Sequence, residues 1–331
     1  MTADRTNVRV SESPYISTPR GPMPKVSVVI CIYNHCAFIQ NAVRSVQSQS
    51  YTDWECLIVD DASTDSTPEI VAQLVAEDNR IRYIRNKTNL GVGASRNIGN
   101  ALATGEWIAV LDADDWWAPD KLRVQLEALQ KVPGAVFCFS GHMSVSDTDK
   151  KVVLCPQTWV KELDLGLRMA NLILHSSVVV SREAMSCAGG YDEKLLSAHD
   201  WDFYLRLLLR WGSRAFVYVD EPLTFYRVHG DSISSNWRRM LSDERTIIWR
   251  YFSRGAWALR HPVGAHRVVS EQLHKEMKVL EWSGRPTQAF LRSFMLLSLS
   301  PHRRWLWLEF TQRLTTLMFG PRPLSDYSQL R

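Results

Sequence analysis

The sequence lacks the cysteine and glycine patterns that mark several common functional sites. Six cysteines are present, but no two of them form a Cys-x-x-Cys pair, so we expect no zinc site. No Gly-x-Gly-x-x-Gly motif follows the first apolar segment, which argues against a dehydrogenase that binds a dinucleotide. The sequence contains no recognisable nucleic-acid reading module, so we expect no nucleic-acid partner.

Long apolar runs are missing as well. No run reaches the ~18 apolar residues that predict a membrane-spanning helix, and the polar, Pro- and Ser-rich residues 1–24 contain no apolar core of signal-peptide length. Cys31 and Cys56 lie in apolar segments, where a free thiol packs as a small hydrophobe. We therefore expect a cytoplasmic protein in which residues 1–24 form a flexible tail.

The charge of the chain is divided unevenly along its length. The net charge of +4 combines a basic segment, residues 236–331, with 16 Lys and Arg against 7 Asp and Glu, and an acidic remainder with 23 against 28. The basic segment also holds 6 of the 13 tryptophans and has a helical pattern. We predict one domain over 25–235 and a helical, basic, Trp-rich extension over 236–331, whose charge suits an anionic partner or a solvated surface.

The first half of the chain alternates between short apolar segments and segments with helical spacing. Segments that are β-branched and apolar on both faces predict buried strands. The predicted strands are 25–34, 55–63, 81–85 and 107–115, and the predicted helices are 37–49, 66–75 and 91–103. Such alternation with right-handed crossovers predicts an α/β fold with a doubly wound, mostly parallel sheet flanked by helices.

The second half is less regular. Segments 135–140 and 176–181 are typical of strands, and 199–212 is predicted as a helix. Residues 216–230 are predicted as two paired strands around Glu221-Pro222. The segment from 141 to 175 has no pattern that predicts a structure.

Polar side chains follow three of the predicted parallel strands at the point where each strand ends. Ligands of such sheets bind beyond the carboxyl ends of the strands. We therefore expect one site at this edge, formed by Tyr33 and Asn34, by Asp60 and Asp61, and by an acidic cluster of Asp112, Asp114 and Asp115.

The acidic cluster predicts a divalent cation. Carboxylate oxygens favour hard ions such as Mg²⁺ or Mn²⁺, and residues two apart on a strand share a face, so Asp112 and Asp114 can point together. So few ligands suggest a half-open site that holds the metal together with substrate phosphates. The alternative is a solvated acidic turn that caps the helix near Pro119.

Four further residues are candidates, each with a simpler structural alternative. Asp61 can accept hydrogen bonds from a nucleobase or ribose, or cap the following turn. Arg96 can neutralise phosphate or pair with an acid. Asp200 can act as a general base, kept ionised by helix amides, or serve as a helix N-cap. His229 can contact a metal or phosphate, or be structural.

Five segments together resemble the family 2 glycosyltransferases, which have the GT-A fold and include bacterial enzymes that build polysaccharides. They occur in the family's order over residues 25–235: VSVVICIYN, IVDDASTDST, NLGVGASRNIGNALATGEWIAVLDADD, GGYDE…HDWDFYLRL and YRVHGDSIS. The resemblance implies an inverting glycosyltransferase with a nucleotide-diphosphate sugar donor, usually a UDP-sugar. It also implies that the acceptor is a hydroxyl of a glycan or lipid-linked molecule in cell-surface polysaccharide or glycolipid assembly.

The resemblance also assigns roles to individual residues. It implies that Asp112 and Asp114 hold Mn²⁺ or Mg²⁺, with Asp114 as the direct ligand, and that His229 approaches the metal and diphosphate. Asp61 recognises the base near Tyr33 and Asn34, while Arg96 and Asp112 help to hold the nucleotide. The resemblance implies that Asp200 is the catalytic base. Asp115 and His199 are supporting residues, and His199 occupies a position where family members often carry Glu.

The sequence leaves two rival functions and two possible roles for residues 303–319. The rivals are a catalytically inactive scaffold that binds sugar nucleotides and a sugar-1-phosphate nucleotidyltransferase. The latter should carry a Gly-rich basic loop after the first strand, where this chain has YNHCAFIQ. Residues 303–319 are predicted to form a basic, aromatic helix that contacts the inner face of the plasma membrane peripherally, or that packs against the catalytic domain or a dimer partner.

Overall fold

The structure is a computed structural model that describes residues 25–229, 237–251, 288 and 291–292. The chain divides into two compact units, one comprising residues 1–167 and 171–235 and the other residues 168–170 and 236–331. The predicted tail at 1–24 and the predicted membrane-contact segment at 303–319 lie outside the described residues.

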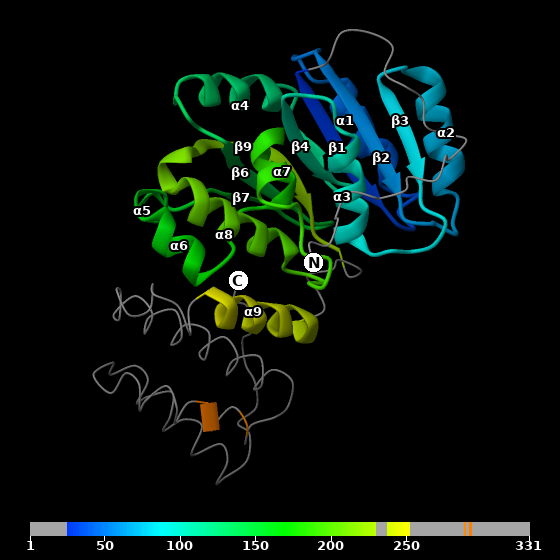
Figure 1. Cartoon of the computed structure of the whole chain (residues 1–331). Helices are drawn as coiled ribbons and strands as arrows, with labels where there is room; N and C mark the ends of the chain where they lie inside the picture. Colours follow the sequence, from blue (N-terminus) through cyan, green and yellow to red (C-terminus); the bar gives the residue numbers. More distant parts are fainter. Residues whose placement is uncertain (1–24, 230–236, 252–287, 289–290, 293–331) are drawn as a thin grey trace, which may run out of the picture. The chain divides into compact units, whose positions relative to one another are not determined.

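The first unit begins with the predicted alternation of strands and helices (Figure 1). Strands β1, β2, β3 and β4 are all parallel, in the spatial order β3-β2-β1-β4. The elements are β1 (Val26–Ile32), α1 (Ile39–Gln47), β2 (Trp54–Asp60), α2 (Thr67–Glu77), β3 (Ile81–Arg85), α3 (Val92–Leu102) and β4 (Trp107–Asp112). The prediction of a parallel α/β sheet is therefore confirmed for this half.

Helices cover both faces of the parallel strands because successive side chains of a strand point to opposite faces. Val28 and Ile30 of β1 join the core cluster that includes Val43 of α1. On the other face, Gly99 of α3 lies so close that an added Cβ would meet Val29 at 2.5 Å. This contact requires glycine and holds α3 against β1 and β2.

Beyond β4 the sheet continues with mixed strand directions. The nine-stranded sheet has the order β3-β2-β1-β4-β8-β6-β9-β5, with β7 paired to β6. These strands are β5 (Trp116–Trp117), β6 (Phe137–Val145), β7 (Lys150–Val153), β8 (Val179–Ser181) and β9 (Phe216–Arg227). The helices between β5 and β9 are α4 (Lys121–Gln130), α5 (Gln157–Lys161), α6 (Leu163–Met169), α7 (Arg182–Cys187) and α8 (His199–Trp211), with short 3-10 turns at His175–Ser177 and Ser213–Ala215.

The prediction of two paired strands around Glu221-Pro222 was wrong. Residues 216–227 form the single strand β9, which runs parallel to β6 along its length. Val219 pairs with Ser140 and Pro222 pairs with Gly141, so Asp220 and Glu221 are extra residues on β9. A bulge of this kind accommodates a proline, which has no N–H to donate to the neighbouring strand.

In the second unit, the described residues contain helix α9 (Trp237–Tyr251), in which Ile247 and Ile248 are buried. Within the described parts of both units, none of the helices combines the length and apolarity needed to cross a bilayer.

Candidate active site

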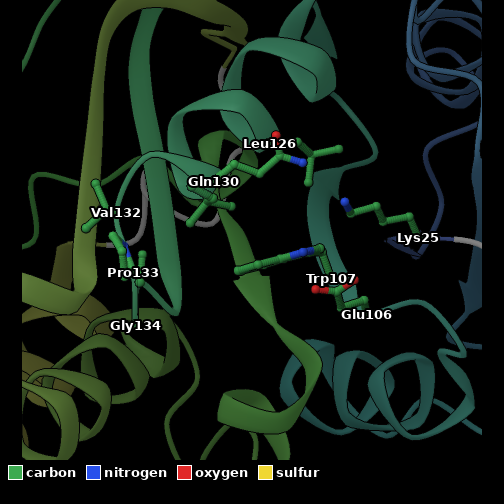
Figure 2. Close-up of a pocket in the computed structure, with 10 residues that line it drawn as sticks. Lys25, Glu106, Trp107, Leu126, Gln130, Val132, Pro133 and Gly134 are labelled. Atoms are coloured by element: carbon green, nitrogen blue, oxygen red, sulfur yellow. The ribbon is translucent and has the colours of Figure 1, made fainter.

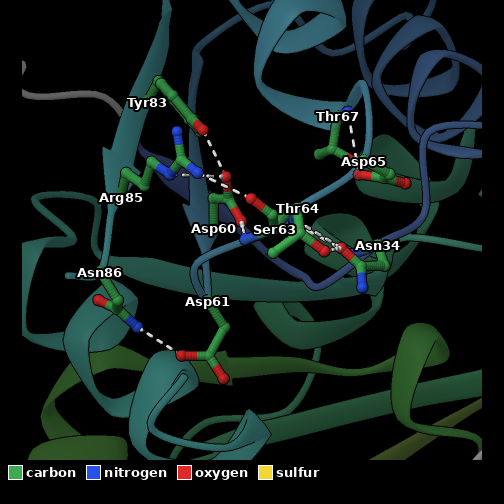
Figure 3. A network of polar contacts seen from close by, with 10 residues as sticks. All are labelled: Asn34, Asp60, Asp61, Ser63, Thr64, Asp65, Thr67, Tyr83, Arg85 and Asn86. Atoms are coloured by element: carbon green, nitrogen blue, oxygen red, sulfur yellow. Dashed lines mark hydrogen bonds and ion pairs between the residues drawn. The ribbon is translucent and has the colours of Figure 1, made fainter. Parts of the chain in front are cut away.

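The loops after β1 and β2 are tied to each other at the carboxyl edge of the sheet. Asn34 has a left-handed backbone with φ of 56°, which asparagine tolerates better than most residues. Its backbone N–H donates to Ser63 Oγ at 3.0 Å, and its Oδ1 accepts from the Thr64 N–H at 2.8 Å (Figure 3). Tyr33 beside it is 44% exposed. The structure therefore places an exposed aromatic ring beside a rigid double loop.

Asp60, the last residue of β2, and Asp61, which follows it, point in different directions and hold different segments (Figure 3). Asp60 is fully buried and accepts from the Ser63 N–H at 2.8 Å and from Tyr83 Oη at 2.5 Å. Asp61 accepts from Asn86 Nδ2 and from the N–H groups of Leu90 and Gly91, each at 2.8 Å. Asp61 thus anchors the loop that opens α3. A carboxylate can accept about four hydrogen bonds, so the three that Asp61 accepts leave room for one from a nucleobase. Recognition of the nucleobase by Asp61 stays a prediction.

The acidic cluster is split between one buried and two more exposed carboxylates. The side chains of Asp112 and Asp114 are 31% and 18% exposed, whereas Asp115 is 1% exposed. Asp115 accepts from Ser176 Oγ at 2.6 Å and from the Arg227 N–H at 3.0 Å. Burial, with the nearby charges of Asp114 and Asp112, raises the pKa of Asp115 well above its ordinary value. Asp115 therefore supports the cluster from inside, and only its two neighbours can reach a ligand.

The cluster has a positive partner in the protein itself. Arg96, on α3, is buried, and its guanidinium contacts Asp112 Oδ1 through Nη2 and His199 Nε2 through Nη1. This chain of contacts joins α3, the end of β4 and the first turn of α8. It also brings together three predicted site residues that are far apart in the sequence.

Asp114 is paired with His229, which follows β9. His229 Nε2 lies 2.9 Å from Asp114 Oδ2. The neighbouring Arg227 donates from Nε to the Asp114 carbonyl at 3.0 Å, and its guanidinium lies 4.9 Å from the Phe38 ring and 4.7 Å from the Trp116 ring. Arg227 is absent from the predicted site. Its position in the sequence, two residues before the predicted site residue His229, could have identified it.

Asp200 lies in the first turn of α8 but does not cap it. The N-cap residue is Ala198, so the N-cap alternative for Asp200 is wrong. Asp200 Oδ1 accepts from the Trp201 N–H and Oδ2 accepts from Asn171 Nδ2, both at 2.8 Å. Burial raises the pKa of Asp200 to about 6, although the Trp201 N–H, Arg96 and Asn171 each act to lower it.

The pKa of Asp200 suits a base that works near neutral pH. Burial outweighs the helix amide, but a pKa of about 6 still leaves the carboxylate mostly ionised at neutral pH, as expected. Asn171, which orients Asp200, was missed because it lies in the segment 141–175, where the sequence has no readable pattern.

The donor set of Asp112, Asp114 and His229 fits a divalent cation with open coordination positions. It offers carboxylate oxygens and one imidazole, which suit Mn²⁺. Within the part of the chain that the structure describes, no three His, Cys, Asp or Glu side chains already converge on one point. A cation here would therefore need further ligands from a bound substrate, as is usual where metal and phosphates bind together.

A hollow of about 230 Å³ lies elsewhere, at the amino edge of the sheet (Figure 2). Trp107, the first residue of β4, lines it, whereas the acidic cluster begins at Asp112, the last residue of β4. Among the described residues that line it, the charged ones are Lys25 and Glu106. It lacks the convergent acids of the carboxyl edge, which is therefore the better candidate for the active site.

Comparison with known proteins identifies the family of this chain. The profile of the family described as Glycosyl transferase family 2 matches residues 27–170. TuaG of Bacillus subtilis, a candidate teichuronic acid biosynthesis glycosyltransferase, is 33% identical over 217 residues, covering 64% of this chain and 82% of TuaG. An uncharacterized glycosyltransferase of Haemophilus influenzae is 29% identical, covering 65% of this chain and 83% of its own.

Solved structures share the fold at low sequence identity. TarS 1-349 of S. aureus in complex with UDP-GlcNAc has a TM-score of 0.57 and 17% identity, covering 91% of this chain and 94% of that chain. The mannosyltransferase PcManGT of Pyrobaculum calidifontis in complex with GDP-Man and Mn²⁺ has a TM-score of 0.56 and 18% identity, covering 94% and 92%. Together with the curled, mostly parallel sheet, these relatives show that the chain belongs to the family 2 glycosyltransferases and is a glycosyltransferase with the GT-A fold.

Proposed function

We propose that this glycosyltransferase is a metal-dependent, inverting enzyme that moves a sugar from a nucleotide-diphosphate donor, a UDP-sugar, to an acceptor hydroxyl. The observation that carries the proposal is the chain of contacts from Asp112 through Arg96 to His199. This chain links the proposed metal and nucleotide side of the site to Asp200, the next residue along α8. Solved relatives bound to UDP-GlcNAc, or to GDP-Man with Mn²⁺, support this donor class.

Asp112, Asp114 and His229 are the proposed holders of the cation, Mn²⁺ or Mg²⁺. When bound, the cation would stabilise negative charge on the leaving diphosphate. Asp114 and His229 are already paired at 2.9 Å, and Arg227 fixes the backbone of Asp114 from β9. The chain thus arranges these two side chains before any ligand arrives.

The nucleotide is proposed to bind over the loops after β1 and β2. Tyr33 offers an exposed ring for a base or ribose, and Asn34 and Asp61 lie in the two loops that border it. Arg96 pairs with Asp112 and so brings its guanidinium to the end of β4. These roles follow from the family resemblance and are compatible with the positions of the residues.

Asp200 is the proposed catalytic base. Its carboxylate takes the proton of the acceptor hydroxyl while that oxygen bonds to the anomeric carbon and the bond from the anomeric carbon to the diphosphate oxygen breaks. Attack from the face opposite the nucleotide inverts the anomeric configuration. Asn171 and the Trp201 N–H hold the two carboxylate oxygens, so the base has a fixed orientation before the acceptor binds.

The acceptor is proposed to be a glycan or lipid-linked molecule in cell-surface polysaccharide or glycolipid assembly. TuaG, whose name refers to teichuronic acid biosynthesis, supports this class. We place the enzyme in the cytoplasm at the inner face of the plasma membrane, with residues 303–319 as the proposed peripheral contact. Flotation with anionic liposomes at low salt tests this contact, and a protein that stays unbound would contradict it.

The donor proposal is tested by thermal-shift screening of nucleotide sugars with and without Mn²⁺, because a ligand that binds only the folded state raises its apparent stability. A UDP-sugar that raises the Tm only with Mn²⁺ is the expected result. UDP release by the wild-type protein that is lost in Asp200→Asn separates an enzyme from an inactive scaffold. A protein that binds the donor but never releases UDP would favour the scaffold.

A further inference from the structure

A wall of four ring side chains lies behind Arg96, formed by His175, Tyr191, His199 and Tyr204. All four are buried. Ring centroids are 5.4 Å apart for His175 and Tyr191, 5.6 Å for Tyr191 and His199, and 6.3 Å for His175 and His199. The wall is therefore a contiguous packed group next to the guanidinium, and Tyr191 also lies 5.9 Å from the Arg96 guanidinium carbon.

The contact with Arg96 fixes the protonation of His199. A guanidinium can only donate hydrogen bonds, so His199 Nε2 must accept and the single ring proton must lie on Nδ1. That Nδ1 is buried, and a backbone interaction with Leu195 acts to raise the pKa of the ring. Burial and the charge of Arg96 lower the pKa of His199 well below its ordinary value. His199 is a neutral acceptor.

The rest of the wall is neutral too. Burial lowers the pKa of His175 well below its ordinary value and raises the pKa of Tyr191 and Tyr204. His175 Nε2 and Tyr191 Oη are buried without a hydrogen-bond partner among the described residues. The wall therefore offers Arg96 no negative charge.

The one ion pair of Arg96 within the described residues is with Asp112. A glutamate at position 199, which the family resemblance leads one to expect, would place a second carboxylate on the same guanidinium. Two acids would then share a single positive charge, and the pull of Arg96 on Asp112 and on any neighbouring anion would be weaker. A neutral imidazole keeps the geometry of the contact without that competition.

We propose that His199 is a positioning residue that holds the Arg96 guanidinium against Asp112 as a neutral acceptor, so that the charge of Arg96 stays directed at Asp112 and at a nucleotide diphosphate bound beside it. The proposal rests on the proposed function for the identity of that anion. His199 acts through Arg96, and its role is distinct from that of Asp200, which meets the acceptor.

The test compares two substitutions at position 199. In His199→Gln the side-chain oxygen can still accept from Arg96, whereas in His199→Leu, which has a similar volume, no acceptor remains. Calorimetry of UDP binding with Mn²⁺ and the KM for the donor in UDP release are measured. Losing an acceptor for a charged donor should weaken UDP binding and raise the KM about tenfold in His199→Leu, with a smaller change in kcat. His199→Gln should stay within about threefold of wild type.

A matched control is Tyr191→Phe, which removes a hydroxyl that has no partner in the described part of the chain and should leave UDP binding unchanged. Equal losses in the Gln and Leu variants, or no loss in His199→Leu, would overturn the proposal. If His199→Leu does not fold, His199→Met takes its place.

A wild-type protein that binds no UDP with Mn²⁺ would refute the proposed function but still leave His199 testable. Crystal structures of the two variants then decide. Arg96 should stay paired with Asp112 in His199→Gln and leave it in His199→Leu. An unmoved Arg96 in the Leu variant would contradict the positioning role.

Discussion

Carboxylates at the two edges of the parallel half-sheet have pKa values that are shifted in opposite directions, lowered for Glu55 at the amino edge and raised for Asp115 and Asp200 at the carboxyl edge. At the amino edge, Glu55 accepts hydrogen bonds from Ser27 Oγ at 2.7 Å, from the N–H and Oγ1 of Thr104 at 2.8 and 2.6 Å, and from Arg82 Nη1 at 3.1 Å. Burial alone would raise the pKa of Glu55, but the hydrogen bonds from Thr104, Ser27 and Arg82 outweigh it and lower the pKa.

At the carboxyl edge the balance is reversed. Asp115 and Asp200 are each held by two hydrogen bonds, yet burial raises the pKa of both, to about 6 for Asp200. Glu55 is therefore satisfied by the fold, whereas Asp115 and Asp200 are left partly unsatisfied, unlike Asp60 and Asp61 at the same edge, which accept hydrogen bonds from the surrounding loops. The difference indicates that Glu55 stabilises the protein, whereas the raised pKa values of Asp115 and Asp200 mark the candidate active site.

Replacing the proposed base, Asp200, should have the largest effect on activity and should not lower stability. Asp200→Asn should lower kcat for UDP release by about 10²–10⁴, because the amide cannot take the acceptor proton. The Tm at pH 7 should not fall, since the substitution removes a charge that burial disfavours. Enzyme assays and thermal unfolding measure both effects. Normal activity in this variant would remove Asp200 from the mechanism.

Replacing the carboxylate at the amino edge should instead lower stability and leave activity unchanged. Glu55→Ala leaves Arg82 buried without its partner, and the two side chains are only 8% and 9% exposed. Breaking such a pair should lower the free energy of unfolding by about 3–5 kcal/mol, while kcat per folded molecule stays unchanged. Denaturant unfolding measures the loss.

Arg123→Ala is the matched control for this loss. It removes exposed ion pairs with Asp120 and Glu127 and should leave the Tm nearly unchanged. A loss in Glu55→Ala no larger than in this control would contradict the comparison between the edges.

The pH dependence of the reaction rate should follow the ionisation of Asp200. Asp200 must be ionised to accept a proton, so the rate should rise about tenfold per pH unit below about pH 6 and level off above it. The stability linked to Asp200 runs the other way. Because its folded pKa is raised to about 6, ionisation costs stability as the pH rises through the range from its unfolded pKa to that value. Rates and Tm from pH 5 to 8 test both signs, and a rate that falls with rising pH would contradict the assignment.

Lys121 is a buried basic group whose pKa is also shifted by burial. Lys121 is fully buried, donates from Nζ to Gln125 Oε1 at 2.6 Å, and lies 4.1 Å from the Trp117 ring. Burial lowers its pKa to about 7, so the unfolded chain binds its proton more tightly. Wild-type stability should therefore gain on the order of 1 kcal/mol per pH unit from this group above about pH 7, up to its unfolded pKa. In Lys121→Met this contribution should vanish, and an unchanged slope would show that Lys121 is not the cause.

The sequence predicted the parallel half well because its strands are buried on both faces and each reads as a short apolar run. All seven residues of β2, for example, are buried. The acids at the ends of these strands were predicted at the right edge for the same reason, since the carboxyl ends of parallel strands share one edge.

Features decided by distant contacts escaped prediction. The long parallel pairing of β9 with β6 overrides the local turn signal of Glu221-Pro222. Asn171 reaches Asp200 from a segment without periodicity. The conformations of Arg96 and His199 depend on a contact across 103 positions of sequence, which no local pattern encodes.

A crystal structure of the protein with Mn²⁺ and UDP would test the proposed site most directly. We expect anomalous density for Mn²⁺ at the carboxyl edge, bonded to Asp114 and to the diphosphate, with Asp112 beside them. A nucleotide bound elsewhere, for instance in the hollow beside Trp107 at the amino edge, with Asp112 and Asp114 facing bulk solvent, would contradict it.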